Sequence, residues 1–393
     1  MEAQSFNNYK QKPFIPAIQK TSTLLILSLI AMVAFIIALN STIIEVSSSY
    51  DTKIKAASLM KRSMNILKSN RMVFSVFIDD ENDPNETGLV GSPFSLITTD
   101  EGDLDAKLTT LDPNFSAGMV ELMVQIGIEK NDTVAVLLTG SMPGGNIAVL
   151  TGLKALGAYP VVITSVGASQ WGANHIDFTW LDMEKILSEE DLIPNRSIAA
   201  SIGGRNDMGR LLSPEGRNII TENIAVHGLP LIKKSRLADN ISHRMKIFKN
   251  IAKIDNYSAM INVGGGVASL GTSFNSKLLP AGIVNRSDVQ NVSLLDGGIE
   301  GVLSKFSKND IPVLHVLNIK SLTEKLGMPF APIPIPEIGV GNLYAVEKYN
   351  VLVALICLIV LCISVFAVGF QSKKEIKEHL INCLLYTSDA ADE

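Results

Sequence analysis

Two long uncharged segments, one near each end of the chain, most constrain what this sequence can fold into. Neither Thr21–Ile44 nor Tyr349–Ser372 contains a charged residue, and both are largely apolar. A helix of about 20 residues is long enough to cross the roughly 30 Å hydrocarbon core of a bilayer. A buried helix of a water-soluble protein is usually shorter and carries polar caps. We therefore predict transmembrane helices at 21–44 and 349–372.

The first segment has a second interpretation, a cleaved signal peptide. The tripeptide Ala38-Leu39-Asn40 lacks the small-x-small pattern of a cleavage site, and the apolar run is long for a signal peptide. We therefore expect an uncleaved anchor.

Basic residues beside the second segment predict the orientation. Lys373, Lys374 and Lys377 follow it, whereas only Lys348 closely precedes it. Cytoplasmic flanks are enriched in lysine and arginine. We expect cytoplasmic tails at 1–20 and 373–393, with the central region outside the cell membrane. Four basic residues that closely follow the first segment oppose this orientation: Lys53, Lys55, Lys61 and Arg62.

Several kinds of site are not expected. The cysteines (Cys357, Cys362 and Cys383) all lie in the second anchor or the tail, so the central region has no disulfide or thiolate metal site. The five histidines show no metal-ligand spacing. A net charge of −5 does not suit nucleic-acid binding. No nucleotide-binding motif is complete either. From these observations together we expect no metal and no cofactor.

The region between the anchors predicts one large domain with two flanking segments. Residues 45–70 include an amphipathic helix at Tyr50–Lys68, suited either to a lipid surface or to supporting the domain. Residues 71–328 form the domain, with a turn-rich acidic stretch at 79–103 that we interpret as solvated loop. Residues 329–348 alternate proline with apolar residues, which is typical of an extended spacer.

The domain alternates strand and helix patterns. Strands are predicted at Thr133–Leu138, Pro160–Thr164, Ser197–Ile202, Ser258–Val263 and Pro312–Leu317, with helices at 114–127, 146–157, 214–228 and about 297–307. Such alternation calls for right-handed crossovers and a mostly parallel sheet with flanking helices, an α/β fold. The runs VAVLL and VVIT suit strands buried on both faces.

Three glycine-rich loops follow predicted strands: GSMPGGN (140–146), GGRNDMG (203–209) and GGG (264–266). Ligands of open parallel sheets bind at the carboxyl ends of the strands, where glycine lets the backbone approach them. Each loop alone is better explained as a tight turn, but together they predict one crevice. The candidate ligand-binding residues are Ser141, Gly144, Gly145, Asn146, Gly203, Gly204, Arg205, Asn206, Asp207, Arg210, Gly264, Gly265 and Gly266.

The ligand expected in this crevice is a carboxylate. Arg205 and Arg210 offer the forked donors that carboxylates favour. The alternative is an Arg–Asp pair that orders the loop.

A serine hydrolase is a competing interpretation. Ser141 stands between a strand and a helix, but GSMPG is not the G-x-S-x-G elbow. Asp207 and His227 are weak catalytic candidates beside it; Asp177 and the other histidines of the domain (His175, His243 and His315) are further ones. His227 is more simply explained as a helix-end residue.

The layout and loops resemble the bacterial poly-γ-glutamate system protein family. The likeness lies in the two anchors, the KAASLMKRSMNILK segment, GSMPGGN, GGRNDMGRLLSPEGR and INVGGGVASLGTS. It extends to about residue 383; the ending LLYTSDAADE (384–393) resembles translated adapter sequence, an artefact.

The resemblance implies an accessory role in poly-γ-glutamate capsule biosynthesis or export. The implied partners are the membrane-bound synthase subunits, the polymer and the lipid bilayer. The alternative is an extracytoplasmic serine-type hydrolase or γ-glutamyl transferase that acts on the polymer. The resemblance supplies no catalytic residues.

Overall fold

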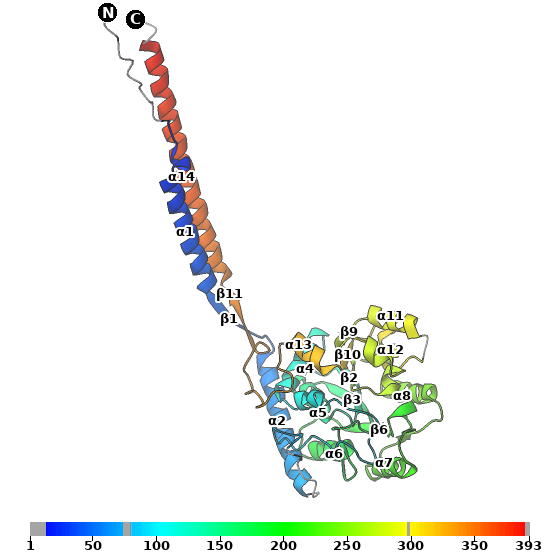
Figure 1. Ribbon diagram of the computed structural model, residues 1–393. Coiled ribbons are helices and arrows are strands. Elements are labelled where there is room, and N and C mark those ends of the chain that lie inside the picture. The colour runs from blue at the N-terminus through cyan, green and yellow to red at the C-terminus, as the bar shows by residue number, and fades with distance from the viewer. Residues whose placement is uncertain (1–12, 74–78, 80, 297–298, 390–393) are drawn as a thin grey trace, which may run out of the picture. The chain divides into compact units, whose positions relative to one another are not determined.

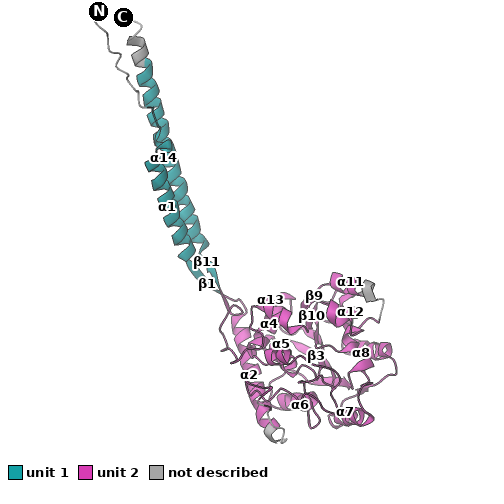
Figure 2. Ribbon diagram, in the orientation of Figure 1, with its two compact units in different colours: residues 1–45, 347–393 teal, residues 46–346 magenta. Residues whose placement is uncertain are grey.

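The computed structural model describes residues 13–73, 79, 81–296 and 299–389. It divides into two compact units, Met1–Glu45 with Glu347–Glu393 and Val46–Val346, which Figure 2 shows in different colours. The first is the anchor unit and the second is the central domain.

The anchor unit consists mainly of two long helices, α1 (Thr21–Asn40) and α14 (Val351–Asp389), which run side by side (Figure 1). A 3-10 turn, η1 (Ala17–Gln19), precedes α1, and the Lys20 ammonium lies 3.2 Å from the Glu375 carboxylate. Helix α1 and the part Val351–Leu384 of α14 are long and apolar enough to cross a membrane. Most of their large apolar side chains are exposed, as expected for helices that contact lipid.

The first predicted span, 21–44, extends beyond the end of α1, and the second, 349–372, starts before α14. Helix α1 ends at Asn40, and strand β1 (Thr42–Val46) follows; β11 (Ala345–Tyr349) pairs with it before α14 begins at Val351. β-Branched residues at 42–44 favour strand, and an apolar composition does not distinguish strand from helix.

The central domain is built on a seven-stranded sheet in the order β7-β6-β3-β2-β8-β10-β9. All neighbouring strands are parallel except β9, which runs antiparallel to β10. The strands are β2 (Thr133–Thr139), β3 (Tyr159–Ser165), β6 (Ser197–Ser201), β7 (Leu231–Ile232), β8 (Ala259–Val263), β9 (Gly282–Val284) and β10 (Val313–Val316). A separate two-stranded sheet joins β4 (Asn174–His175) to β5 (Phe178–Thr179). The predicted α/β fold with a mostly parallel sheet is confirmed.

Helices cover both faces of the sheet. One apolar cluster joins it to α2 (Tyr50–Val73), α3 (Leu104–Thr110), α4 (Asn114–Gln125), α5 (Pro143–Leu156), α6 (Trp180–Glu189), α7 (Pro214–Val226) and α13 (Ile319–Leu326). The other joins it to α8 (Leu237–Ile251), α9 (Val267–Leu270), α11 (Arg286–Asp296) and α12 (Val302–Ser307). The short α10 (Asn275–Leu278), η2 (Arg205–Asp207) and η3 (Ile254–Asn256) complete the domain. Consecutive strand residues alternate between the clusters, which explains the unbroken apolar strand sequences.

Local sequence determines where several helices begin and end. Pro143 starts α5, and Gly157 ends it in the left-handed conformation. The Ser213 hydroxyl accepts a hydrogen bond from Gly216 N and so caps the start of α7, and Pro214 is the first residue of that helix. The predicted helix at about 297–307 has α12 in its second half, while 297–298 lie outside the described residues.

The two segments that flank the domain in sequence pack against it. Helix α2 buries Ala57, Met60 and Leu67 in the core, which supports the domain-supporting interpretation of its apolar face. The proline-rich segment, predicted as a spacer, is hydrogen-bonded to the domain: Ala331 N donates to Thr109 Oγ1 and the Tyr344 hydroxyl donates to Asn114 Oδ1. The segment with alternating proline and apolar residues is therefore not a free spacer, because it contacts the domain.

Candidate functional site

A crevice of about 430 Å³ opens at the carboxyl ends of the parallel strands. The chain runs outward from β2 through β3, β6 and β7, then returns to β8 on the other side of β2. The loops after β2 and β8 diverge at this change of direction, where sheets of this kind bind ligands. Six of the predicted residues line the crevice: Ser141, Gly204, Arg205, Gly264, Gly265 and Gly266.

Three other predicted ligand residues have packing roles at the start of α5. A Cβ on Gly144 would lie 2.5 Å from the Thr110 carbonyl oxygen, and one on Gly145 would lie 3.1 Å from Val263 Cγ1. Asn146 is fully buried, and its Nδ2 donates to Thr139 O at 2.8 Å. These residues join α5 to its neighbours, so the turn explanation of this loop accounts for them.

Gly144→Ala is expected to lower the free energy of unfolding by about 1–3 kcal/mol, because the added methyl group overlaps backbone that cannot move aside. Gly265→Ala is the matched control, since a Cβ there would meet no atom within 4 Å. Urea unfolding of the detergent-solubilised chain, followed by tryptophan fluorescence, measures both. Equal stabilities for the two variants would contradict the packing role.

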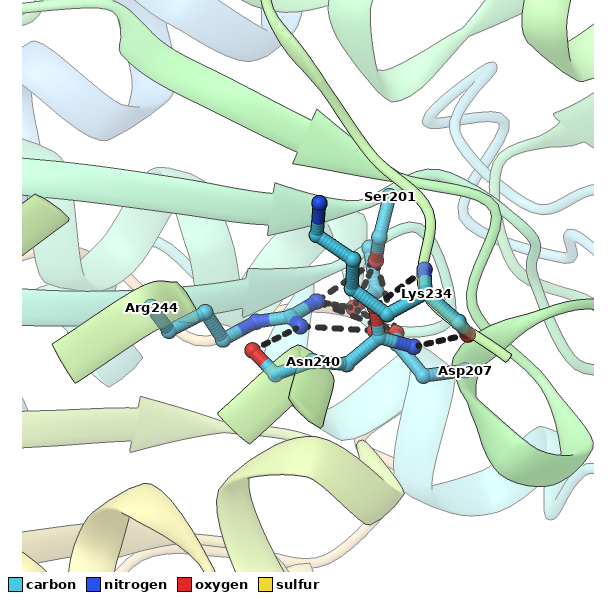
Figure 3. A network of polar contacts seen from close by, with 6 residues as sticks. Ser201, Asp207, Lys234, Asn240 and Arg244 are labelled. Carbon is cyan, nitrogen blue, oxygen red and sulfur yellow. Dashed lines mark hydrogen bonds and ion pairs between the residues drawn. The ribbon is translucent and has the colours of Figure 1, made fainter. Parts of the chain in front are cut away.

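The GGRNDMG loop is held by a buried ion pair. Asp207 does not line the crevice; it contacts Arg244 of α8, and each side chain is 1% exposed. Figure 3 shows the guanidinium between Asp207 and Ser201, with Asn240 beside it. The interpretation of an Arg–Asp pair ordering the loop therefore applies to Asp207, but its partner is Arg244 instead of Arg205 or Arg210.

The rest of this loop divides between the crevice and the loop's own structure. Gly203 has a φ of +80°, which favours glycine, and its carbonyl accepts from Gly209 N at 2.7 Å. With the Asn206 amide turned so that its oxygen faces Arg210, Arg210 donates to that oxygen through Nε and Nη1, both at 3.1 Å. Only Arg205 of the two arginines lines the crevice, so the predicted arginine fork is not assembled there.

The predicted serine triad is also not assembled. His227 ends α7, as its helix-end interpretation predicted, and its Nε2 lies 2.8 Å from Asp182 Oδ1. Burial acts to raise the pKa of Asp182, but the hydrogen bonds from His227 and Thr179 outweigh this effect and leave the pKa below its usual value. Neither His227 nor Asp207 lines the crevice that contains Ser141.

The remaining histidine candidates are elsewhere too. His315 is buried on β10, where Nδ1 lies 2.9 Å from Asn262 Nδ2, and burial lowers its pKa to about 4. The Asp177 backbone N–H donates to His175 Nδ1, and neither residue lines the crevice. His243 lies on α8, and burial together with nearby basic side chains lowers its pKa.

Two residues that the sequence interpretation missed stand at the centre of the crevice wall. Lys107, from α3, donates through Nζ to Ser169 Oγ at 3.0 Å and to the Ser141 carbonyl oxygen. Ser169 follows β3, and its N–H donates to Ser141 Oγ at 2.9 Å. Both side chains are buried, and burial lowers the pKa of Lys107 to about 8, although Asp103 raises it slightly. A lysine in a short helix gives no sequence signal of burial.

The charges around the crevice are mixed. Acidic lining residues are Asp100, Glu101 and Asp103, and basic ones are Lys107, Arg205 and Lys320. The first three belong to the acidic stretch at 79–103 and are exposed outside helix and strand, as its interpretation as solvated loop predicts. That interpretation is wrong for Asp83, which is 1% exposed and accepts hydrogen bonds from Thr87 and Gly88. Polar contacts of this kind are not visible in composition.

A second hollow, here called the lysine groove, lies on the other side of the domain core, along α8 and α12. It measures about 820 Å³ and is lined by Lys246, Lys249, Lys253, Lys305 and Lys308, with Asp255 and Glu300 as its carboxylates. Lys246 and Lys249 lie on α8, Lys253 follows the end of that helix at Ile251, and all three side chains are exposed.

No group of three or more histidine, cysteine or acidic residues suited to a metal ion occurs in the part of the chain that the structure describes. No protein-family model, curated protein or solved structure matches the chain.

Proposed function

We propose that the protein is a membrane-anchored accessory component of poly-γ-glutamate biosynthesis or export, and that its central domain contacts the anionic polymer outside the cell membrane. The resemblance of the anchors and glycine loops to the poly-γ-glutamate system protein family supports this role. The two apolar helices support the anchoring, and the lysines that follow the uncharged segment of α14 support the orientation.

The lysine groove is the observation that carries the polymer contact. Lys246 and Lys249 on α8 and Lys253 just after it are exposed along the groove, so their ammonium groups are free to meet a repeating row of carboxylates. Lys308 is paired with Glu300 and Lys305 is half-buried, so these three lysines are the exposed positive charges of the groove. Attraction between such exposed charges weakens as salt screens it.

Binding of poly-γ-glutamate to the full chain in detergent micelles tests this proposal. Each exposed ion pair contributes about 0.2–1 kcal/mol, so replacing Lys246, Lys249 and Lys253 by glutamine is expected to weaken binding about ten-fold at low salt. The control replaces Lys130, Lys185 and Lys277, which are equally exposed elsewhere and keep the net charge matched. Fluorescence anisotropy of labelled polymer at two salt concentrations reports the affinity.

Equal affinity of the groove variant and its control for the polymer would contradict the proposal that the lysine groove is the polymer site. If the unaltered chain does not bind the polymer at low salt, polymer contact itself is contradicted, and the synthase subunits remain as the proposed partners.

The alternative function, a serine-type hydrolase or γ-glutamyl transferase built on Ser141, Asp207 and His227, lacks support from the contacts of Asp207 and His227.

A further inference from the structure

Lys107 is a buried lysine without a carboxylate partner. Its side chain is 5% exposed, and no acidic oxygen lies within 4.0 Å of Nζ among the ion pairs of the described residues. Nζ instead contacts Ser169 Oγ, the Ser141 carbonyl oxygen and, at 3.5 Å, Met142 Sδ. A buried charged amine is costly unless it is paired, so burial without a carboxylate partner favours the uncharged form.

Ser169 is placed as a nucleophile would be. Its Oγ lies 3.0 Å from Lys107 Nζ, within reach of proton transfer, and its backbone N–H is fixed by Ser141 Oγ. Ser169, Lys107 and Ser141 all line the crevice, so a ligand there meets this cluster.

The loop after β8 offers groups suited to an oxyanion. Gly265 and Gly266 line the same crevice, and neither N–H donates to an acceptor within the described part of the domain. A Cβ on Gly265 would meet no atom within 4 Å, so the loop leaves space beside its backbone. Free backbone N–H groups are the usual stabilisers of a tetrahedral oxyanion.

We propose that Ser169 and Lys107 form a serine–lysine catalytic pair for acyl transfer from an amide. The neutral Lys107 amine takes the Ser169 hydroxyl proton as Oγ bonds to the amide carbonyl carbon. The C–N bond then breaks, the Lys107 ammonium gives its proton to the leaving amine, and an ester to Ser169 remains. Water or an acceptor amine attacks this ester, Lys107 takes the attacker's proton, and returning it to Oγ restores the serine.

The crevice charges indicate the substrate class. Acidic residues (Asp100, Glu101 and Asp103) and basic ones (Arg205 and Lys320) line the same space. A substrate whose acyl group carries both an ammonium and a carboxylate, such as a γ-glutamyl amide, complements both signs. This inference does not rest on polymer binding, because the crevice and the lysine groove share no lining residue.

The test uses the full chain in detergent micelles with two probes, γ-glutamyl p-nitroanilide and a fluorophosphonate that acylates reactive serines. We expect release of p-nitroaniline, with a rate that rises with pH as Lys107 loses its proton near pH 8. Ser169→Ala and Lys107→Met should each lower the rate at least 100-fold. Ser188→Ala, on α6 and outside the crevice, should keep it.

Peptide mapping of the fluorophosphonate adduct keeps the test independent of variant folding. An adduct on Ser169 of the unaltered chain, absent in folded Lys107→Met, supports the pair. An adduct on Ser141 alone, or no adduct and no p-nitroaniline release, overturns it. Near-ultraviolet circular dichroism establishes that each variant is folded.

Discussion

Replacing Arg244 by alanine is expected to lower the free energy of unfolding of the central domain by about 3–5 kcal/mol, because it leaves the Asp207 carboxylate buried without its partner. The guanidinium donates to both carboxylate oxygens, at 2.6 Å through Nη1 and 3.0 Å through Nη2, and to Ser201 Oγ at 2.6 Å (Figure 3). Removing one member of such a pair costs more than the pair contributes, since the remaining charge keeps its full desolvation penalty.

Two further variants make this prediction specific. Arg236→Ala breaks a comparable pair with Asp239, but those side chains are 77% and 39% exposed, so the expected loss is much smaller. The double variant Arg244→Met with Asp207→Leu removes both charges and should recover most of the loss. Urea unfolding followed by the fluorescence of Trp171 and Trp180 measures all of them. A loss no larger for Arg244→Ala than for Arg236→Ala would contradict the prediction.

Glu184→Gln is expected to stabilise the domain above pH 7 by roughly 3 kcal/mol relative to the unaltered chain. Glu184 lies fully buried on α6, and burial raises its pKa to about 7, although hydrogen bonds from Ser197 N and Oγ act to lower it. A glutamine keeps both contacts, because its amide oxygen accepts from Ser197 N while its NH₂ donates to Ser197 Oγ.

The sign of this effect follows from the raised pKa. The folded chain holds the Glu184 proton more tightly than the unfolded chain, whose carboxyl titrates near 4.5. The contribution of protonated Glu184 is therefore complete below about pH 4.5 and is lost as pH rises to about 7. The stability difference between the variant and the unaltered chain should grow across that window and stay constant above it. The exposed Glu189→Gln control should show no such trend, and a flat difference for Glu184→Gln would contradict the prediction.

The fold was largely predictable because its signals are local. Unbroken apolar strands, Pro143 at one helix start and Gly157 at its end are each visible within a few residues. The end of α1 was not, since the apolar stretch that follows it forms β1 without any change in hydropathy. The contacts of the proline-rich segment depend on Asn114 and Thr109, more than 200 residues away in sequence.

The candidate site was predictable only where backbone conformation defines it. Glycine after a strand marks the crevice loops after β6 and β8, so Gly204 and Gly264 were found. Lys107 and Ser169 were not, because Lys107 lies on α3 and Ser169 follows β3, and no spacing in the sequence predicts that their side chains meet. Asp207 was assigned to the ligand for the same reason: its partner Arg244 stands on a distant helix.

The two ends of the central domain meet. Ser47 N donates to Tyr344 O at 2.9 Å, and the buried Lys53 amine donates to Leu343 O at 2.6 Å. Almost 300 residues therefore leave and re-enter the anchor unit at neighbouring points, the arrangement of a domain inserted into a helical hairpin. The same domain could therefore be inserted into another helical hairpin whose strands end side by side. Its folding would depend on contact between its two ends and not on which helix precedes it.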